Sequence, residues 1–252
     1  MLTFATLTAT FEQLEHTSSR KQLTTLLADL LGQVDADEIA EVSYLLQGRV
    51  APLYEPVEFG LGERSIEKAV AQAFGIPQTE VHQRDARAGD VGLVVAELAT
   101  AVGHAHTGED RPVREIFAEL RALADLSGAG SAERKIDGLT RLLSGLDPVS
   151  AKHLVRIPLG TSRLGVGDAT VLAAFTQARL GGTRAEQTTL EEAYNRTSDL
   201  GLLGETLWRE GLEGVKALEV VVGRPIRPQL AERLPDVPSL LDKLGGRAHV
   251  QL

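Results

Sequence analysis

The sequence of 252 residues contains no cysteine. Disulfide bonds and thiolate metal sites are therefore excluded, and nothing indicates a small secreted scaffold that depends on cross-links. Aromatic residues are also scarce, at 4% of the chain, although 43% of all residues are hydrophobic. Leu, Ala and Val must therefore fill most of the core, and this composition is typical of packed helices.

Long apolar runs are absent as well. No run approaches the ~20 residues that are needed to span a bilayer. The N-terminal stretch Met1–Leu7 lacks the basic start and the apolar segment of a signal peptide. We therefore predict a cytoplasmic protein that has no membrane partner.

Basic residues are outnumbered by acidic ones. The chain has 26 Lys and Arg against 35 Asp and Glu, which gives a formal net charge of −9. Domains that bind nucleic acids are usually basic, so the overall charge argues against such a partner. A nucleic-acid contact would have to use a local positive face and backbone N–H groups, with the acidic residues on the opposite surface.

The chain repeats part of its own sequence. The matching pairs are Gly60-Leu-Gly-Glu63 with Gly165-Val-Gly-Asp168, Asp90-Val-Gly-Leu93 with Asp199-Leu-Gly-Leu202, and, 112 positions apart, Leu30-Leu31 with Leu142-Leu143 and Gly48 with Gly160. Such self-similarity predicts a duplicated helical half-domain. Two similar halves tend to pack about a pseudo-twofold axis, and duplex nucleic acid has local twofold symmetry too. A double helix is therefore a candidate partner.

Apolar residues recur at helical spacing over most of the chain. The pattern predicts helices over 4–14, 23–31, 39–46, 63–74, 78–87, 91–102, 113–126, 131–144, 148–158, 168–180, 186–197 and 199–211. We predict an all-α domain over 1–216, with roughly a dozen helices in two pseudo-twofold-related halves, about 1–103 and 112–216. A polar surface linker over 104–112 joins the halves.

The composition changes near residue 216. Prolines and glycines become frequent, beginning with Gly223-Arg-Pro-Ile-Arg-Pro228, and they cannot continue a helical bundle. We predict that 217–252 is a connector with a short extended tail, in which Arg247–Leu252 is the first strand of a truncated further domain.

Five segments of the sequence carry a family resemblance. They are Phe59-Gly-Leu-Gly-Glu63, Gly89-Asp-Val-Gly-Leu93, Gly128-Ala-Gly-Ser131, Leu159-Gly-Thr-Ser-Arg-Leu-Gly-Val-Gly167 and Gly223-Arg-Pro-Ile-Arg-Pro-Gln-Leu-Ala231. In order and spacing they resemble ATP-dependent DNA ligases, particularly the archaeal and bacterial relatives of the eukaryotic replicative ligase. The resemblance implies the N-terminal DNA-binding domain, an all-α fold that grips duplex DNA through the minor groove.

The resemblance also sets the limits of the fragment. In this family the segment like 223–231 opens the adenylation domain, and a lysine about twenty residues later takes AMP from ATP. The chain stops where that lysine is expected, so we expect no catalytic residue, metal or cofactor in this fragment. The full-length ligase would use ATP and Mg²⁺ to seal nicks in replication, recombination and repair. The expected partners are nicked double-stranded DNA and the ligase's own adenylation and OB domains, and we expect a nucleoid-associated monomer.

Lys135-Ile136-Asp137-Gly138 spells the Lys-x-Asp-Gly motif at a different place. A covalent lysine needs a lowered pKa and a nucleotide beside it. Lys135 instead follows a Gly-Ser cap, in a predicted helix whose apolar residues recur at helical spacing. We therefore interpret it as a surface residue. Two alternatives remain open at this point: a small adenylyltransferase that uses Lys135, and a helical-repeat scaffold that binds proteins.

Helix N-termini are the predicted DNA contacts, because they offer unpaired N–H groups and a partial positive charge to phosphate. Glycine lets the backbone approach closely. Arg163, Arg20, Ser131 and Gly165 rank highest, and Arg163 is favoured because no acid follows it before Asp168. The alternative is that these residues are folding caps or solvated faces. The predicted DNA-binding residues are Ser18, Ser19, Arg20, Lys21, Gly60, Gly62, Gly128, Gly130, Ser131, Arg134, Lys135, Gly160, Ser162, Arg163, Gly165 and Gly167.

The remaining polar and aromatic candidates are predicted to be structural. Asp90 and Asp199 begin equivalent helices and are predicted N-caps. Trp208 is predicted to pack in the core or against the missing domain. His104 and His106 have no matching ligand cluster and are predicted to be solvated.

Overall fold

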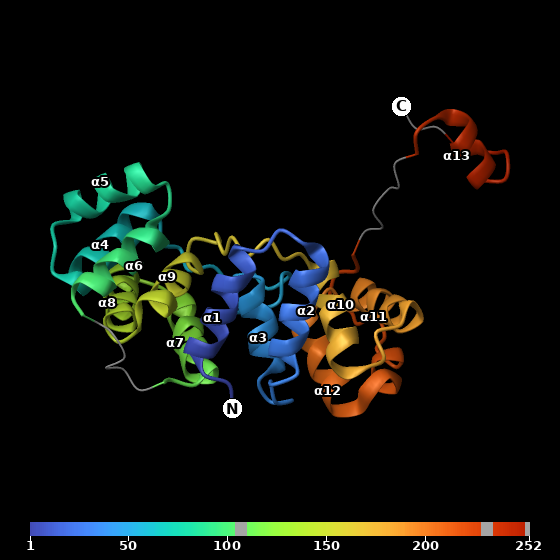
Figure 1. The fold of residues 1–252 in the computed structure, drawn as a ribbon, viewed down its shortest axis with the longest axis horizontal. Helices are drawn as coiled ribbons and strands as arrows, with labels where there is room; N and C mark the ends of the chain where they lie inside the picture. Colours follow the sequence, from blue (N-terminus) through green and yellow to red (C-terminus); the bar gives the residue numbers. More distant parts are fainter. Residues whose placement is uncertain (104–109, 228–233, 250–252) are drawn as a thin grey trace.

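Helices make up nearly all of the regular structure (Figure 1). The computed structural model describes residues 1–103, 110–227 and 234–249. The one β feature in these ranges is an isolated bridge between Thr3 and Pro112, so the all-α prediction is confirmed. The helices are α1 (Phe4–Glu15), α2 (Arg20–Leu31), α3 (Ile39–Leu46), α4 (Glu63–Phe74), α5 (Gln78–Ala88), α6 (Val91–Ala101), α7 (Val113–Asp125), α8 (Ser131–Ser144), α9 (Pro148–Arg156), α10 (Asp168–Arg179), α11 (Arg184–Thr197), α12 (Leu200–Lys216) and α13 (Val237–Lys243).

The two copies of the repeat exchange helices. Helices α1–α6 belong to the first copy and α7–α12 to the second. Helix α6 packs on α9 just as α12 packs on α3, and α4 packs on α8 just as α10 packs on α2. Each lobe in Figure 1 therefore combines the first three helices of one copy with the last three of the other. The copies bury their apolar faces against each other and fold as one body.

A repeated glycine allows the closest of these helix contacts. A Cβ atom on Gly92 would lie 2.6 Å from Arg156 Nε and 3.0 Å from the Lys152 carbonyl oxygen. On the equivalent Gly201 it would lie 2.3 Å from Tyr44 Cζ. Helices α6 and α12 can approach α9 and α3 this closely only because the third residue of each Asp-x-Gly-Leu segment has no side chain.

The predicted caps and the predicted core aromatic are confirmed. The Asp90 carboxylate accepts a hydrogen bond from Gly92 N at 2.8 Å, and the Asp199 carboxylate accepts one from Leu202 N at 2.9 Å. Trp208 is buried, its Nε1 donates to the Val34 carbonyl oxygen at 2.9 Å, and its ring meets Phe175 edge-on.

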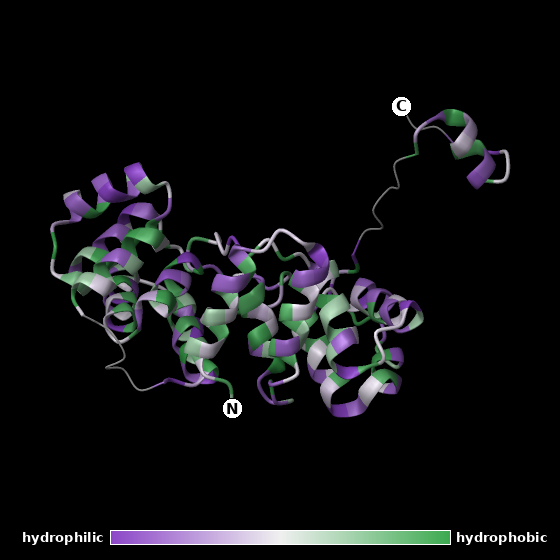
Figure 2. Cartoon of the chain, in the orientation of Figure 1, coloured by the Kyte–Doolittle hydropathy of each residue, from purple (hydrophilic) through white to green (hydrophobic). Residues whose placement is uncertain are grey.

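Charge and polarity lie mainly on the outside of the helical body. Figure 2 shows hydrophilic residues over most of α5, whose one buried residue is Val81. Within the described residues, every helix is too short or too polar to cross a membrane. His104 and His106 lie outside the described residues.

The C-terminal part differs from the prediction. Helix α12 runs on to Lys216, and the predicted end at 211 is a kink at Gly211, whose φ is 69°. Helix α13 was not predicted, although Asp236 caps it by accepting from Ser239 N and a proline stands in its first turn. Residues 247–249 form no strand, and 250–252 of the predicted strand lie outside the described residues.

Candidate nucleic-acid interface

Helices α1 and α9 run in parallel and end together. Thr8 Oγ1 meets Ser150 Oγ at 2.9 Å near their starts, and Arg156 Nη1 donates to Glu15 Oε2 at 2.8 Å at their ends. The segments that follow, 16–19 and 157–167, therefore leave from the same end of the molecule and lie along one edge in Figure 1. Helix α6 begins at this end too, because Arg156 also binds Asp90.

Arg156 ties these three helix ends together from a fully buried position. Its Nε donates to Asp90 Oδ1 at 3.2 Å, and its guanidinium forms ion pairs with Asp90 and Glu15. Burial alone would raise the pKa of Glu15, but the hydrogen bonds from Arg156 and Lys152 outweigh it and lower that pKa to about 2. The charges are thus paired, and segment 157–167 begins from a fixed point.

A neighbouring cluster contains a histidine and two carboxylates. Glu12, Glu15 and His153 bring their potential metal-ligand atoms within 4.8 Å of one another. Lys152 Nζ already binds both carboxylates, at 2.7 Å to Glu12 and 2.9 Å to Glu15. A protein ammonium group therefore occupies the place that a metal ion would need, and the cluster stabilises the α1–α9 contact.

The predicted glycine turns from both copies meet at one cavity. This cavity, of about 510 Å³, is lined by segments 47–51, 57–62 and 157–160. It therefore includes Gly60, Gly62 and Gly160. Gly48, with a φ of +68°, lies against Ser162, and a Cβ atom on Gly48 would be 3.3 Å from Ser162 Cβ. The turn over 60–62 thus lies beside the 157–160 segment, and not beside its repeat counterpart 165–167, whose Gly167 lines a different cavity.

Arg163 lies on the surface of this region in a strained conformation. Its φ of 53° is in the left-handed region, which is uncommon for a residue with a side chain. Its Nη2 donates to the Gly89 carbonyl oxygen at 2.9 Å, and its Nη1 lies 3.5 Å from Asp90 Oδ2. The expectation of no nearby acid was wrong, because folding brings Asp90 close. Asp90 is shared with Arg156, which also pairs with Glu15, and 53% of the Arg163 side chain is exposed.

Lys135 is buried, so its interpretation as a surface residue was wrong. Its Nζ donates to the carbonyl oxygens of Phe59 at 2.7 Å and Ala124 at 3.3 Å. The repeat explains this burial, since Lys135 stands 112 positions after the buried Leu23. Two backbone carbonyl oxygens hold the Lys135 ammonium group, whereas an adenylated lysine must reach a nucleotide bound beside it. The position argues against both the adenylyltransferase alternative and a direct phosphate contact.

The other predicted contacts lie on the surface, and only Ser131 and Ser162 are half-buried. Arg134 folds back on its own turn, donating to the carbonyl oxygens of Ser127 and Ala129, both at 3.2 Å. Ser19 caps α2 by accepting from Gln22 N at 3.4 Å. Within the described part of the chain, Arg20 and Lys21 form no ion pair and remain open to a ligand.

Known proteins are similar to this chain in sequence. The family model described as DNA ligase N terminus matches residues 3–176. A probable DNA ligase of Dictyoglomus thermophilum is 39% identical over 242 residues, which cover 96% of this chain and 40% of that protein. DNA ligases of Sulfolobus acidocaldarius and Saccharolobus solfataricus are 38% and 40% identical, over 95% of this chain and 42% and 41% of their own lengths. The chain belongs to the DNA ligase N-terminal family.

This DNA ligase N-terminal chain spans about two fifths of the length of these relatives. The resemblance drawn from the five sequence segments is confirmed at the level of the family.

Two residues at this end of the ligase chain were missed from sequence. Arg49 is half-buried, lines the glycine cavity and forms no ion pair among the described residues. Glu58 is exposed, lines the same cavity and stands two positions before Gly60, just as Arg163 stands two positions before Gly165. Aligning the two copies residue by residue would have found this charge reversal.

Proposed function

We propose that this DNA ligase N-terminal chain binds nicked duplex DNA without reading its sequence. The observation that carries the proposal is the gathering of glycine turns, helix N-termini and exposed or half-buried cations at one end of the molecule. Backbone N–H groups at helix starts attract phosphate. The cations beside them are Arg20, Lys21 and Arg49, which form no ion pair among the described residues, and Arg163, which pairs with Asp90 but is 53% exposed.

The proposed contacts are with phosphate and sugar. Such contacts position a protein on a duplex but carry no sequence information, which suits an enzyme that closes nicks wherever they occur. Contact through the minor groove, with some deformation of the duplex, is part of the proposal. Lys135 is left out because its ammonium group already serves two backbone carbonyls.

The proposal places this chain within a larger enzyme. The adenylation and OB domains would supply the catalytic lysine and would use ATP and Mg²⁺, while this chain holds the nick during replication, recombination and repair. We further propose that the chain acts as a monomer in the cytoplasm, on nucleoid DNA.

Fluorescence anisotropy with labelled nicked duplexes of two unrelated sequences tests the proposal. Both duplexes should bind with the same affinity, and the affinity should fall steeply as salt rises. Absence of binding at low salt would contradict the proposal. Incubation with labelled ATP tests the adenylyltransferase alternative in the same preparation, since only that alternative predicts a covalent AMP adduct on Lys135.

A further inference from the structure

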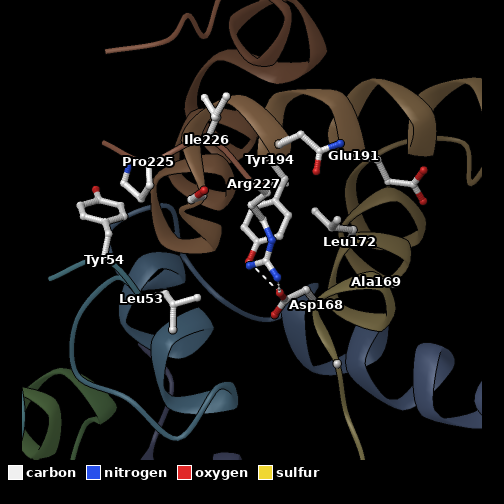
Figure 3. Close-up of a pocket in the computed structure, with 13 residues that line it drawn as sticks. Leu53, Tyr54, Asp168, Ala169, Leu172, Glu191, Tyr194, Pro225, Ile226 and Arg227 are labelled. Carbon is white, nitrogen blue, oxygen red and sulfur yellow. Dashed lines mark hydrogen bonds and ion pairs between the residues drawn. The ribbon is translucent and has the colours of Figure 1, made fainter. Parts of the chain in front are cut away.

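Arg227 docks the far part of the connector onto the helical body. Arg227 Nη2 lies 2.9 Å from Asp168 Oδ2, and Nη1 donates to Tyr194 Oη at 2.6 Å (Figure 3). The guanidinium carbon also lies 4.8 Å from the centre of the Tyr194 ring. The Arg227 backbone N–H donates to the Asn195 carbonyl oxygen at 2.9 Å. Side chain and backbone therefore fix the connector to α11 and to the start of α10.

Asp168 is the centre of this arrangement. It is the first residue of α10, directly after Gly167 of the proposed DNA-binding turn. Its Oδ1 accepts from Gln47 Nε2 at 2.9 Å, and its Oδ2 accepts from Tyr194 Oη at 2.8 Å. Arg227 is the one cation that pairs with Asp168 among the described residues. Gly167, Asp168 and the connector residues 225–227 line the same cavity of about 890 Å³.

We propose that Arg227 is a positioning residue that couples connector docking to phosphate binding at the α10 tip. The proposal rests on the proposed DNA-binding function. A carboxylate at the α10 tip repels a phosphate bound there, and this repulsion is strong only when the Asp168 charge is unpaired. The docked state, in which Arg227 neutralises Asp168, therefore binds phosphate more tightly than the undocked state.

Because binding free energies are thermodynamically linked, the coupling also acts in the reverse direction, from DNA to the connector. If the docked connector strengthens DNA binding, bound DNA must shift the connector toward its docked state by the same factor. The direction in which the chain leaves the helical body toward the rest of the ligase would then be set only when DNA occupies the tip. Arg227 would thus report DNA occupancy to the following domain.

A double-mutant cycle with nicked duplex tests this coupling. Arg227→Gln should weaken binding about fivefold or more, which is the lower range of measured coupling. Adding Asp168→Asn should restore near wild-type affinity, because no unpaired carboxylate remains. If Arg227→Gln weakens binding equally in the Asp168→Asn background, Arg227 contacts DNA directly and the inference is overturned. Arg224→Gln is the matched control, since it removes a cation from the same connector that forms no described ion pair, and its effect should stay within about twofold.

Hydrogen exchange of the Arg227 backbone amide supplies the reciprocal readout. Saturating nicked duplex should slow its exchange in the wild-type chain by about fivefold or more, and this slowing should vanish in Arg227→Gln. If the duplex binds but exchange of the Arg227 amide is not slowed, the inference is overturned while the proposed function stands. Failure of the wild-type chain to bind duplex overturns the proposed function and this inference with it. Melting curves confirm that each variant is folded.

Discussion

Asp90 and Asp199 show how one residue has diverged between the two copies. Both cap the helix that follows them. Asp90 also pairs with Arg156 and Arg163, whereas Asp199 accepts from the hydroxyls of Tyr44 at 2.8 Å and Tyr54 at 3.0 Å. Burial, together with Asp199, raises the pKa of Tyr54 to about 12 and that of Tyr44 further. The aspartate of the first copy thus meets arginines of the second copy beside the proposed interface, whereas the aspartate of the second copy meets tyrosines of the first.

Asp90→Asn separates capping from charge pairing. Asparagine caps a helix as well as aspartate does, so the expected loss of about 2–3 kcal/mol in the free energy of unfolding comes from the buried charged hydrogen bonds of Arg156. Urea unfolding measures it. The matched variant Asp199→Asn keeps one oxygen that accepts from Tyr44 and Leu202 N, and its new NH2 group can donate to the Tyr54 hydroxyl, so it should lose less. Equal losses in the two variants would contradict this account of Asp90.

The lowered pKa of the buried His153 predicts that the fold loses stability in acid. Burial, reinforced by repulsion from Arg156 and Lys152 and opposed by the hydrogen bond to Glu12, lowers its pKa from 6.5 to about 4. The unfolded chain then binds the proton more readily, so the stabilisation is complete above pH 6.5 and is lost as the pH falls toward 4. The loss is on the order of 3 kcal/mol.

Urea unfolding of His153→Gln across this range tests the assignment. The variant should lose less free energy of unfolding between pH 6.5 and pH 4 than the wild-type chain does. His16→Gln is the control, because His16 also meets Glu12 but is 71% exposed. A pH dependence that is unchanged in His153→Gln would show that the acid sensitivity resides elsewhere.

At the scale of helices, the repeated glycines Gly92 and Gly201 lie where the helices pack too closely for a side chain. Gly92→Ala and Gly201→Ala should each cost about 1–3 kcal/mol or more, because the new methyl group meets Arg156 and Lys152 or the Tyr44 ring. Thermal unfolding measures the effect. Gly145→Ala is the control, since its Cβ atom would meet nothing closer than 3.9 Å. A harmless Gly92→Ala or Gly201→Ala would mean that the exchanged helices are not held as closely as described.

Sequence predicted the helices well where apolar periodicity and caps agreed. The predicted bounds of α4 and α8 coincide with the observed ones. Helix α13 was missed because it buries no residue and so has no apolar period. The burial of Lys135 was missed because a charged residue was assumed to be exposed. The repeat places Lys135 at the position equivalent to the buried Leu23.

At the scale of the molecule, the exchange of helices between copies creates the candidate interface. Because α6 packs on α9 and α10 packs on α2, turns that are distant in sequence reach the same end. Sequence could predict that these turns are glycine-lined and exposed. It could not predict that Asp90 meets Arg163 or that Arg49 lines the cavity, because tertiary packing decides both. A net charge of −9 is compatible with DNA binding only if cations are locally in excess there.

The salt dependence of duplex binding tests this local excess most directly. The wild-type chain, Arg163→Ala and Glu58→Arg are compared on two unrelated nicked duplexes, with Arg141→Ala, at the other end of α8 from the turns, as the control. We predict that Arg163→Ala reduces the slope of log affinity against log salt by about one and that Glu58→Arg increases it by about one, alike on both sequences. If both variants keep the wild-type slope and affinity, DNA does not bind at these helix tips.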